Sequence, residues 1–192
     1  MALPRSLDLT VAQLLDELAG PVPPGGGSAA AVTVAMAAAV VAMAARASLE
    51  SWDAAAGAAA QAETLRARAA PLAQHTAEGY EAALAVRDGV AALVPEKRDW
   101  EIGRVFSAAA EPPLEIARVA ADVAELAAEV ATRGEPRVRA DAIAAATLAA
   151  AAARAAVTLV SANLTAVDGD PRVAEVERLA RIAGDAAARL VG

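Results

Sequence analysis

The chain has 192 residues, a length that suits one well-cored domain and is short for two. Hydrophobic residues make up 57% of it, but much of this fraction is alanine and only four residues are aromatic. The composition therefore excludes the bulky core of a β-sandwich and favours helices, because alanine is the best helix former. A formal charge of −7 argues against non-specific nucleic-acid binding, and the lack of cysteine excludes disulfides, thiolate catalysis and cysteine zinc sites.

The compartment is predicted from the same composition and from the N-terminus. Residues Met1 to Leu9 contain two charges and no apolar signal core, which together with the missing cysteines predicts a cytoplasmic protein. The uncharged stretch from Gly25 to Ala45 is nearly long enough to span a membrane. Its alanine and glycine content makes insertion close to neutral in free energy, so we predict a buried central helix and no membrane association. A membrane-associated helical protein is the weaker alternative.

The N-terminal third contains two helices separated by a Pro- and Gly-rich turn. Thr10 and Gln13 form a capping box before a helix that ends at Gly20-Pro21. After the turn Pro23–Ser28, Ser28 is expected to cap a second helix that runs to about Ala47 and has no polar face, which is typical of the middle of a bundle.

Four further helices are expected, with short loops between them. Two carry internal prolines, which should kink rather than end them. The last begins with the strong start signal of an N-cap aspartate followed by proline. They are Asp53–Arg87, with Asp53 as its expected cap and Pro71 inside it, Trp100–Thr132 with Pro112-Pro113, Asp141–Val167, and the helix that follows Asp170-Pro171. The sequence thus predicts a single domain, residues 1–192, that is an all-α, up-and-down bundle of about six helices. Because an alanine-rich core buries little area per residue, a homodimer is expected.

The turn itself, Gly25, Gly26, Gly27 and Ser28, has two interpretations. Glycines before an apolar helix let a ligand approach the main chain, and a helix N-terminus offers unpaired N–H groups and a positive dipole end. The four residues would then bind an anionic or polar ligand. The alternative is a tight inter-helix turn capped by Ser28.

Several motifs occur in one order along nearly the whole chain. They are Leu14-Leu15-Asp16-Glu17-Leu18-Ala19, Pro24-Gly25-Gly26-Gly27-Ser28, Met43 near the end of a small-residue helix, Tyr80, Ala109-x-x-Pro112, the connector Gly134…Asp141, and Asn163-Leu164. In this order they resemble the cyclodeaminase/cyclohydrolase family, which includes the cyclodeaminase domain of formiminotransferase-cyclodeaminase and stand-alone methenyltetrahydrofolate cyclohydrolases. The glycine turn is the specific part of the match.

The resemblance implies a homodimeric all-α enzyme that acts on one-carbon folates without a metal or nucleotide cofactor. Two reactions are implied, hydrolysis of methenyltetrahydrofolate or closure of 5-formimidoyltetrahydrofolate with loss of ammonia. Both pass through a tetrahedral carbon and require a proton to be moved. No metal site is expected from the residues either, because one histidine cannot supply a typical cluster.

The chain departs from the family pattern at polar positions. The connector lacks the usual Asn and Ser, which are replaced by Glu135 and Ala140, and Thr76 and Leu159 stand where an Asp and an Asn are usual. Because these changes remove a carboxylate, amides and a hydroxyl, the alternative function is a non-catalytic helical dimer that keeps the fold and a ligand cleft.

The candidate site residues each have a simpler structural interpretation. Asp141, the retained connector carboxylate, is the candidate acid/base, or else a plain N-cap. Arg137 and Arg139 would hold an anionic glutamate tail, or else belong to a solvated basic loop. Tyr80 would stack on or hydrogen-bond a pterin ring, or else be an ordinary half-buried tyrosine. Asn163 needs a polar partner, whether a ligand or another helix. 

Overall fold

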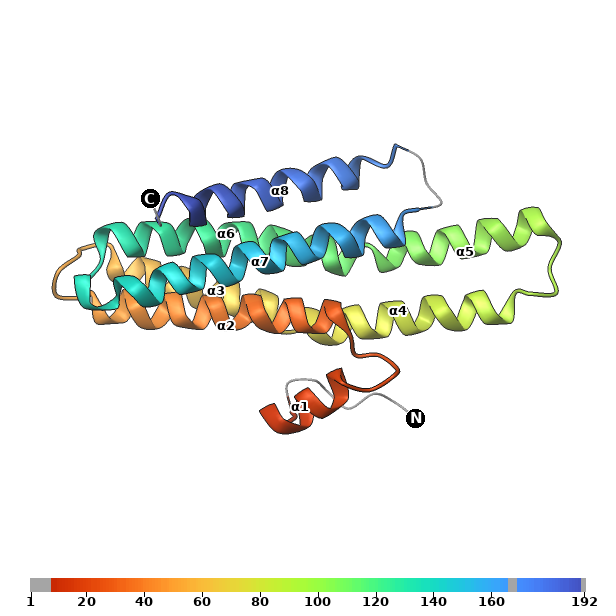
Figure 1. Cartoon of the computed structure of the whole chain (residues 1–192), viewed down its shortest axis with the longest axis horizontal. Coiled ribbons are helices and arrows are strands. Elements are labelled where there is room, and N and C mark those ends of the chain that lie inside the picture. The colour runs from red at the N-terminus through yellow and green to blue at the C-terminus, as the bar shows by residue number, and fades with distance from the viewer. Residues whose placement is uncertain (1–7, 166–168, 191–192) are drawn as a thin grey trace.

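The computed structural model describes residues 8–165 and 169–190, and those residues form helices and no strand. The fold is an all-α bundle, as predicted (Figure 1). The helices are α1 Val11–Leu18, α2 Gly26–Ala47, α3 Ala55–Ala69, α4 Leu72–Gly89, α5 Pro95–Ala109, α6 Glu111–Arg133, the short 3-10 helix η1 Pro136–Val138, α7 Arg139–Asn163 and α8 Pro171–Ala188.

The core lies where α6 packs between α7, α8 and α2. Its largest fully buried aliphatic side chains on α6 are Leu114, Ile116, Val119, Val123 and Val130, whereas α2 and α7 contribute mainly alanine. Alanine lets helices approach closely, so a bundle with few bulky side chains still excludes water. The buried central helix that the sequence predicts in α2 is therefore present, with eleven buried residues.

Both proline-containing helices are divided into kinked pairs. The expected helix from Asp53 to Arg87 becomes α3 and α4, and the one from Trp100 to Thr132 becomes α5 and α6. The linking residues Ala70 and Ala110 keep right-handed helical backbone angles, so the chain bends without turning back. As a result α4 and α5 extend together beyond the other helices (Figure 1).

Three predicted caps are wrong, and two are confirmed. The capping box of Thr10 and Gln13 is formed, and Asp170 accepts a bond from the backbone N–H of Arg172. Ser28, however, lies inside α2, which begins at Gly26 after Gly25. Asp53 and Asp141 also cap nothing, because α3 follows Ala54 and α7 follows Val138. Asp141 instead lies in the first turn of α7. The predicted end of that helix, Val167, lies outside the described residues.

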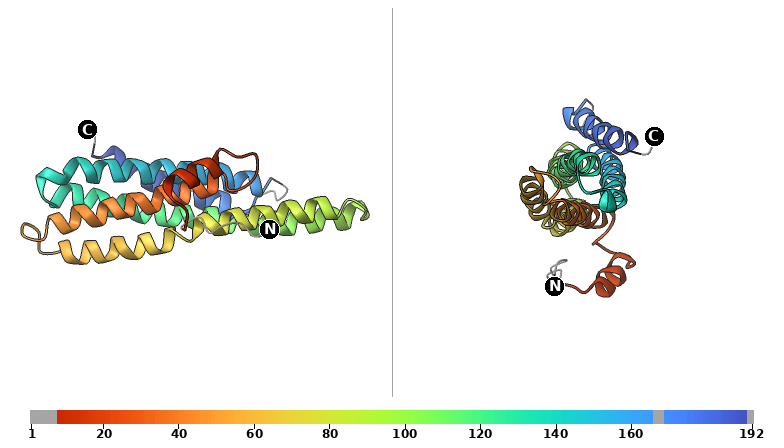
Figure 2. Two further views of the ribbon diagram at one scale, coloured as in Figure 1. Left: turned by 90° about the horizontal axis from the view of Figure 1, so that it is seen from below. Right: turned by 90° about the vertical axis from the view of Figure 1, so that its left-hand side faces the viewer.

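The N-terminal helix α1 lies apart from the bundle. It has no buried residue, and its apolar side chains Val11 and Leu15 are exposed. In Figure 1 and in the end view of Figure 2 it lies below α2, joined to it by the loop that precedes Gly25.

Within the described part of the chain, two segments are long and apolar enough to cross a membrane. They are Gly26–Ala47, with a mean hydropathy of 2.1, and Pro136–Asn163, with 1.8. In the first, 56% of the most apolar window is buried inside the bundle. A core helix of a soluble protein passes the same test, so the length and composition of these segments do not require a membrane.

Candidate functional site

A pocket of about 510 Å³ opens where α2 begins and α7 ends. The glycine turn forms one wall, α4 forms a second, and the last turns of α7 with the α5–α6 junction form a third. The end of α1 and the loop after it complete the lining. Its lining residues are Leu18, Gly20, Pro21, Val22, Pro23, Pro24, Gly25, Gly26, Gly27, Ser28, Thr76, Ala77, Tyr80, Leu84, Ala109, Pro113, Leu159, Ala162 and Asn163.

The glycine turn presents main chain to the pocket. Gly25 is the N-cap of α2 and has no side chain to cap the helix, so the first backbone bond into the helix is the one that Ala29 N–H donates to the Gly25 carbonyl at 3.0 Å. The amides of Gly26, Gly27 and Ser28 precede that bond. Amides in this position, at the positive end of a helix dipole, suit a partially negative ligand atom.

Close packing fixes the turn against α4. The buried hydroxyl of Ser28 donates a hydrogen bond of 2.6 Å to the carbonyl of Ala73. A Cβ on Gly27 would lie 2.0 Å from Cγ2 of Thr76, so only glycine fits there. Ser28 therefore holds the pocket in shape rather than acting as the predicted cap.

Tyr80 and Asn163 come together in the same pocket although 83 positions separate them in the sequence. Tyr80 is 42% exposed and packs edge-to-face on Phe106, with ring centroids 6.3 Å apart. The side-chain amide of Asn163 donates to the carbonyl of Ala109 at 3.0 Å. The partner that a polar residue in α7 requires is thus the α5 backbone, and the ring of Tyr80, held by Phe106, is the aromatic surface of the pocket.

The structure does not bring Arg137, Arg139 and Asp141 into this pocket within one chain. They are exposed residues at the beginning of α7 or just before it, whereas the pocket lies at its end. From Asp141 to Asn163 the helix rises about 33 Å. Of the positions that depart from the family pattern, Thr76 and Leu159 line the pocket, whereas Glu135 and Ala140 lie at the distant end.

The described lining is uncharged. It contains no Asp, Glu, His, Lys or Arg, and its polar side chains are Ser28, Thr76, Tyr80 and Asn163. His75, on α4, is exposed and does not line the pocket. Across residues 8–165 and 169–190, no three His, Asp or Glu side chains are close enough to hold a metal ion. As built by one chain, the pocket can bind a largely apolar, flat molecule, and it lacks a strong proton carrier.

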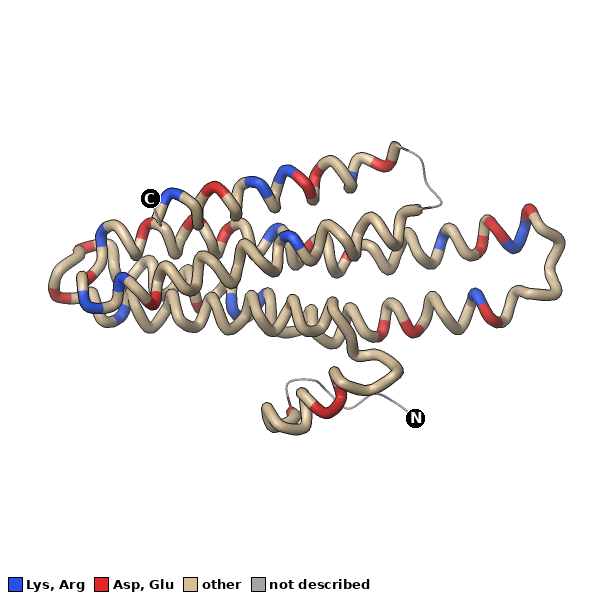
Figure 3. Tube along the Cα trace, in the orientation of Figure 1, with Lys and Arg blue, Asp and Glu red and all other residues tan. Residues whose placement is uncertain are grey.

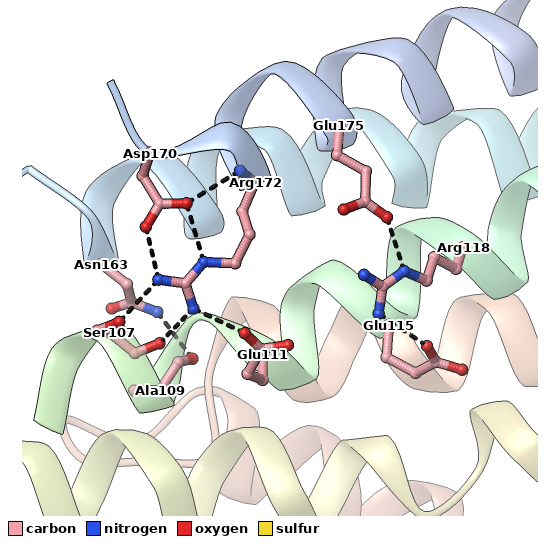
Figure 4. Close-up of polar contacts among 9 residues, drawn as sticks. All are labelled: Ser107, Ala109, Glu111, Glu115, Arg118, Asn163, Asp170, Arg172 and Glu175. Atoms are coloured by element: carbon pink, nitrogen blue, oxygen red, sulfur yellow. Dashed lines mark hydrogen bonds and ion pairs between the residues drawn. The ribbon is translucent and has the colours of Figure 1, made fainter. Parts of the chain in front are cut away.

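A group of polar contacts around Arg172 was not predicted (Figure 4). Arg172 donates to Asp170, to Glu111 and to both the carbonyl and the hydroxyl of Ser107, at distances from 2.7 to 3.0 Å. These bonds tie the start of α8 to the α5–α6 junction, which carries Ala109 and the pocket residue Pro113. The side-chain bond from Arg172, followed by its backbone bond, lowers the pKa of the Asp170 carboxyl to about 2. Only Asp170, through its cap motif, was visible in the sequence.

A second ion-pair group lies further along α8. Arg118 on α6 donates to Glu175 at 2.8 Å and lies 3.5 Å from Glu115, as Figure 4 shows. The bond to Glu175 is the largest cause that raises the pKa of the Arg118 guanidinium. Both groups hold α8 onto α6, and neither lines the pocket.

The fold and the site define an all-α bundle with an uncharged pocket at a glycine-rich helix start. The family model of formiminotransferase-cyclodeaminase matches residues 10–181, so the chain belongs to this family. The crystal structure of formiminotetrahydrofolate cyclodeaminase from Thermotoga maritima is similar, with a TM-score of 0.83 and 22% sequence identity, covering 95% of this chain and 93% of that one. At that identity the likeness shows the shared fold. No curated protein sequence matches the chain.

Proposed function

We propose that this protein is a cytoplasmic one-carbon folate enzyme, either a methenyltetrahydrofolate cyclohydrolase or a formimidoyltetrahydrofolate cyclodeaminase. The observation that carries the proposal is that the most specific family motif, Pro24 to Ser28, opens onto the pocket of about 510 Å³. Family membership supports a folate-related, cyclodeaminase-like role. The choice between the two reactions, and action without a metal or nucleotide cofactor, belong to the proposal.

The pocket chemistry suits the reacting end of a reduced folate. The ring of Tyr80, which packs edge-to-face on Phe106, would pack against the flat pterin, and the apolar side chains of Leu84 and Leu159 would exclude water around it. The amides at the start of α2 would face the electron-rich oxygen or nitrogen that develops on the one-carbon unit. Oriented backbone donors of this kind stabilise charge that appears in a tetrahedral transition state.

The test is the decay of methenyltetrahydrofolate absorbance with purified protein, beside a no-protein control. The pocket variant is Ala162→Trp, because Ala162 is an exposed lining residue and an indole there fills the cavity without displacing the core. The matched control is Ala82→Trp, the same substitution at an exposed position of α4 outside the lining. We expect accelerated decay that Ala162→Trp reduces at least tenfold and Ala82→Trp leaves unchanged.

If the methenyltetrahydrofolate absorbance falls no faster with wild-type protein than without protein, we next measure ammonia release from formimidoyltetrahydrofolate. The same variants are used. Activity in that assay assigns the cyclodeaminase reaction. Inactivity in both assays, with folded protein, overturns the enzymatic proposal.

The second candidate is a non-catalytic folate-binding helical protein. The uncharged lining favours it, because no described residue there is a carboxylate, histidine, lysine or arginine. Calorimetric titration with tetrahydrofolate separates the two candidates. Binding that Ala162→Trp abolishes, without turnover in either assay, is the expected result for the second candidate.

A further inference from the structure

The polar side chains that line the pocket make hydrogen bonds within the chain, which limits what they can offer a ligand. The hydroxyls of Ser28 and Thr76 each donate to a backbone carbonyl of α4, and the side-chain amide of Asn163 donates to the α5 backbone. A hydroxyl has one proton to donate. Ser28 and Thr76 can therefore present only lone pairs to the pocket, and a lone pair carries no net charge.

The main chain at the start of α2 supplies the donors. The amides of Gly26, Gly27 and Ser28 precede the first backbone bond of the helix, and no side chain caps them. They lie at the positive end of the dipole of a 22-residue helix. This wall of the pocket favours an electron-rich ligand atom and opposes a positive charge.

The acidic residues close in sequence to the lining do not balance that positive end. Glu111, in the α5–α6 junction, is held by Arg172 at 2.7 Å. Glu78, on α4, is exposed and accepts a bond from the side chain of Gln74 at 2.9 Å. Neither lines the pocket, and the start of α2 and the end of α7 carry no charged residue (Figure 3). A cation in the pocket would find no counter-ion among its described lining residues.

The rest of the lining makes an unpaired charge costly. Leu84, Leu159 and Val22 contribute apolar surface, and a charge next to such surface is unfavourable unless an opposite charge pairs with it. The ring face of Tyr80 is the one lining group that attracts cations. Because Tyr80 is 42% exposed, that attraction is weak.

The one-carbon forms of a reduced folate differ in charge. The methenyl bridge and the protonated formimidoyl group are amidinium cations, whereas the formyl group is neutral and offers carbonyl lone pairs. We propose that this pocket selects the neutral formyl form over the cationic forms, and that Thr76 sets the preference. Thr76 is the side chain in closest contact with the glycine turn, since a Cβ on Gly27 would lie 2.0 Å from its Cγ2. The inference rests on the proposed function, because it takes a folate as the ligand.

Such a preference acts in the direction of methenyl hydrolysis. The oxygen of water bonds to the cationic methenyl carbon and one water proton leaves to solvent, so the tetrahedral intermediate is neutral. The carbon–N5 bond then breaks as the hydroxyl proton passes through solvent to N5, which gives the 10-formyl product. A site that binds neutral forms more tightly than the cation lowers the free energy of the intermediate relative to the bound substrate. It also retains the product, so inhibition by the formyl product is expected.

The test compares 5-formyltetrahydrofolate with 5-formimidoyltetrahydrofolate, which differ in one group, a carbonyl oxygen against a protonated imino nitrogen. Calorimetric titration gives both affinities, and if the formimidoyl form is turned over, its KM is compared with the inhibition constant of the formyl form. Wild type should bind the formyl form about tenfold or more tightly. Thr76→Asp places a carboxylate beside the glycine turn and should shift the ratio of affinities toward the cation by about tenfold to a hundredfold. Thr76→Asn, which is equal in size and uncharged, should leave the ratio within about threefold of wild type.

A second pair of variants covers the case in which Thr76→Asp does not fold. Ala162 is an exposed lining residue, so Ala162→Asp and Ala162→Asn repeat the comparison without burying a charge. Ala82→Asp, at an exposed position of α4 outside the lining, should leave the ratio unchanged. Wild type that binds the two ligands alike or prefers the cation overturns the inference alone, as do Asp and Asn variants that shift the ratio equally. Wild type that binds neither ligand overturns the proposed function and this inference with it.

Discussion

Gly27 of α2 and Thr76 of α4 approach so closely that a Cβ on the glycine would lie 2.0 Å from the Cγ2 methyl of the threonine and 3.0 Å from its Cβ. Both residues line the pocket, so this contact fixes the distance between the glycine turn and the wall that carries Tyr80. Threonine is branched at Cβ and has little freedom to move aside. The spacing between α2 and α4, and with it the shape of the pocket, therefore depends on residue 27 being a glycine.

Gly27→Ala is expected to destabilise the protein by about 1–3 kcal/mol, the usual range for overpacking. Urea unfolding followed by circular dichroism measures it. The matched control is Gly57→Ala, an exposed helical position of α3 with nothing within 4 Å of the added Cβ, which should stabilise by about 0.5–1 kcal/mol. In a double-mutant cycle, Thr76→Ser should recover part of the Gly27→Ala cost, because it removes the clashing methyl. If the effects of Gly27→Ala and Thr76→Ser on stability were simply additive, α2 and α4 would be free to move apart and the contact would not fix their spacing.

At the other end of the bundle, Ser48 forms a close contact with the residues after α6, as Gly27 does with Thr76 at the pocket end. Its buried hydroxyl accepts a bond from the Glu135 N–H at 2.8 Å and donates one to the carbonyl of Ala44 at 2.8 Å. Ser48→Ala leaves that N–H without its side-chain acceptor, which should cost about 1–3 kcal/mol in the free energy of unfolding. Ser51→Ala, which removes a longer bond of 3.3 Å from an exposed hydroxyl, should cost less than about 0.5 kcal/mol. Equal losses of stability in the two variants would contradict a stabilising role for the buried Ser48–Glu135 bond.

The local features of the fold could be predicted from the sequence, because their causes are local. The capping box at Thr10 and the start signal at Asp170 involve residues two or three positions apart, and both are formed. The caps expected at Ser28, Asp53 and Asp141 failed for a different reason. Where a helix begins depends on packing as well as on propensity, and the starts at Gly26, Ala55 and Arg139 leave those side chains inside or before the first turn.

The candidate site was predictable only in part. The glycine turn was named from its own residues, Tyr80 and Asn163 were named with the family resemblance, and the structure brings all of them to one pocket. Helical periodicity could not predict that Tyr80 and Asn163 line the same pocket, because that depends on how α4 and α7 pack in the bundle. The distance of Asp141 from Asn163, in contrast, follows directly from the length of the helix between them. Arg172 was missed because its partners Ser107 and Glu111 lie more than 60 positions away.

The Asp170–Arg172 pair predicts a pH dependence. The carboxyl has a pKa of about 2 in the folded protein against an ordinary value of 3.8, because Arg172 binds its charged form. A depressed carboxyl pKa contributes stability that is present above the unfolded value and is lost as the pH falls from about 4 through about 2. Asp170→Asn should therefore lower stability at neutral pH and flatten its decline in that range, as measured by thermal unfolding. The control is Asp88→Asn, which removes an exposed carboxylate beside Arg87. It should leave the decline in stability at low pH as it is in wild type. If Asp170→Asn lost stability between about pH 4 and about pH 2 as steeply as wild type, other carboxyls would be responsible for that loss.

The last prediction concerns the aromatic wall of the pocket. If a pterin packs on the ring of Tyr80, the ring is needed and the hydroxyl contributes less, so Tyr80→Phe should change the affinity for tetrahydrofolate by less than about threefold. Tyr80→Ala removes the stacking surface and leaves Phe106 without its edge-to-face partner, which should weaken binding about tenfold or more, the equivalent of about 1.4 kcal/mol. Trp100→Ala is the matched control, because Trp100 is a 63% exposed aromatic residue outside the lining and its loss should not affect binding. Calorimetric titration measures all three variants. Equal weakening by Tyr80→Phe and Tyr80→Ala would instead assign the interaction to the hydroxyl, and the ligand would then be held at this wall by a hydrogen bond rather than by its flat face.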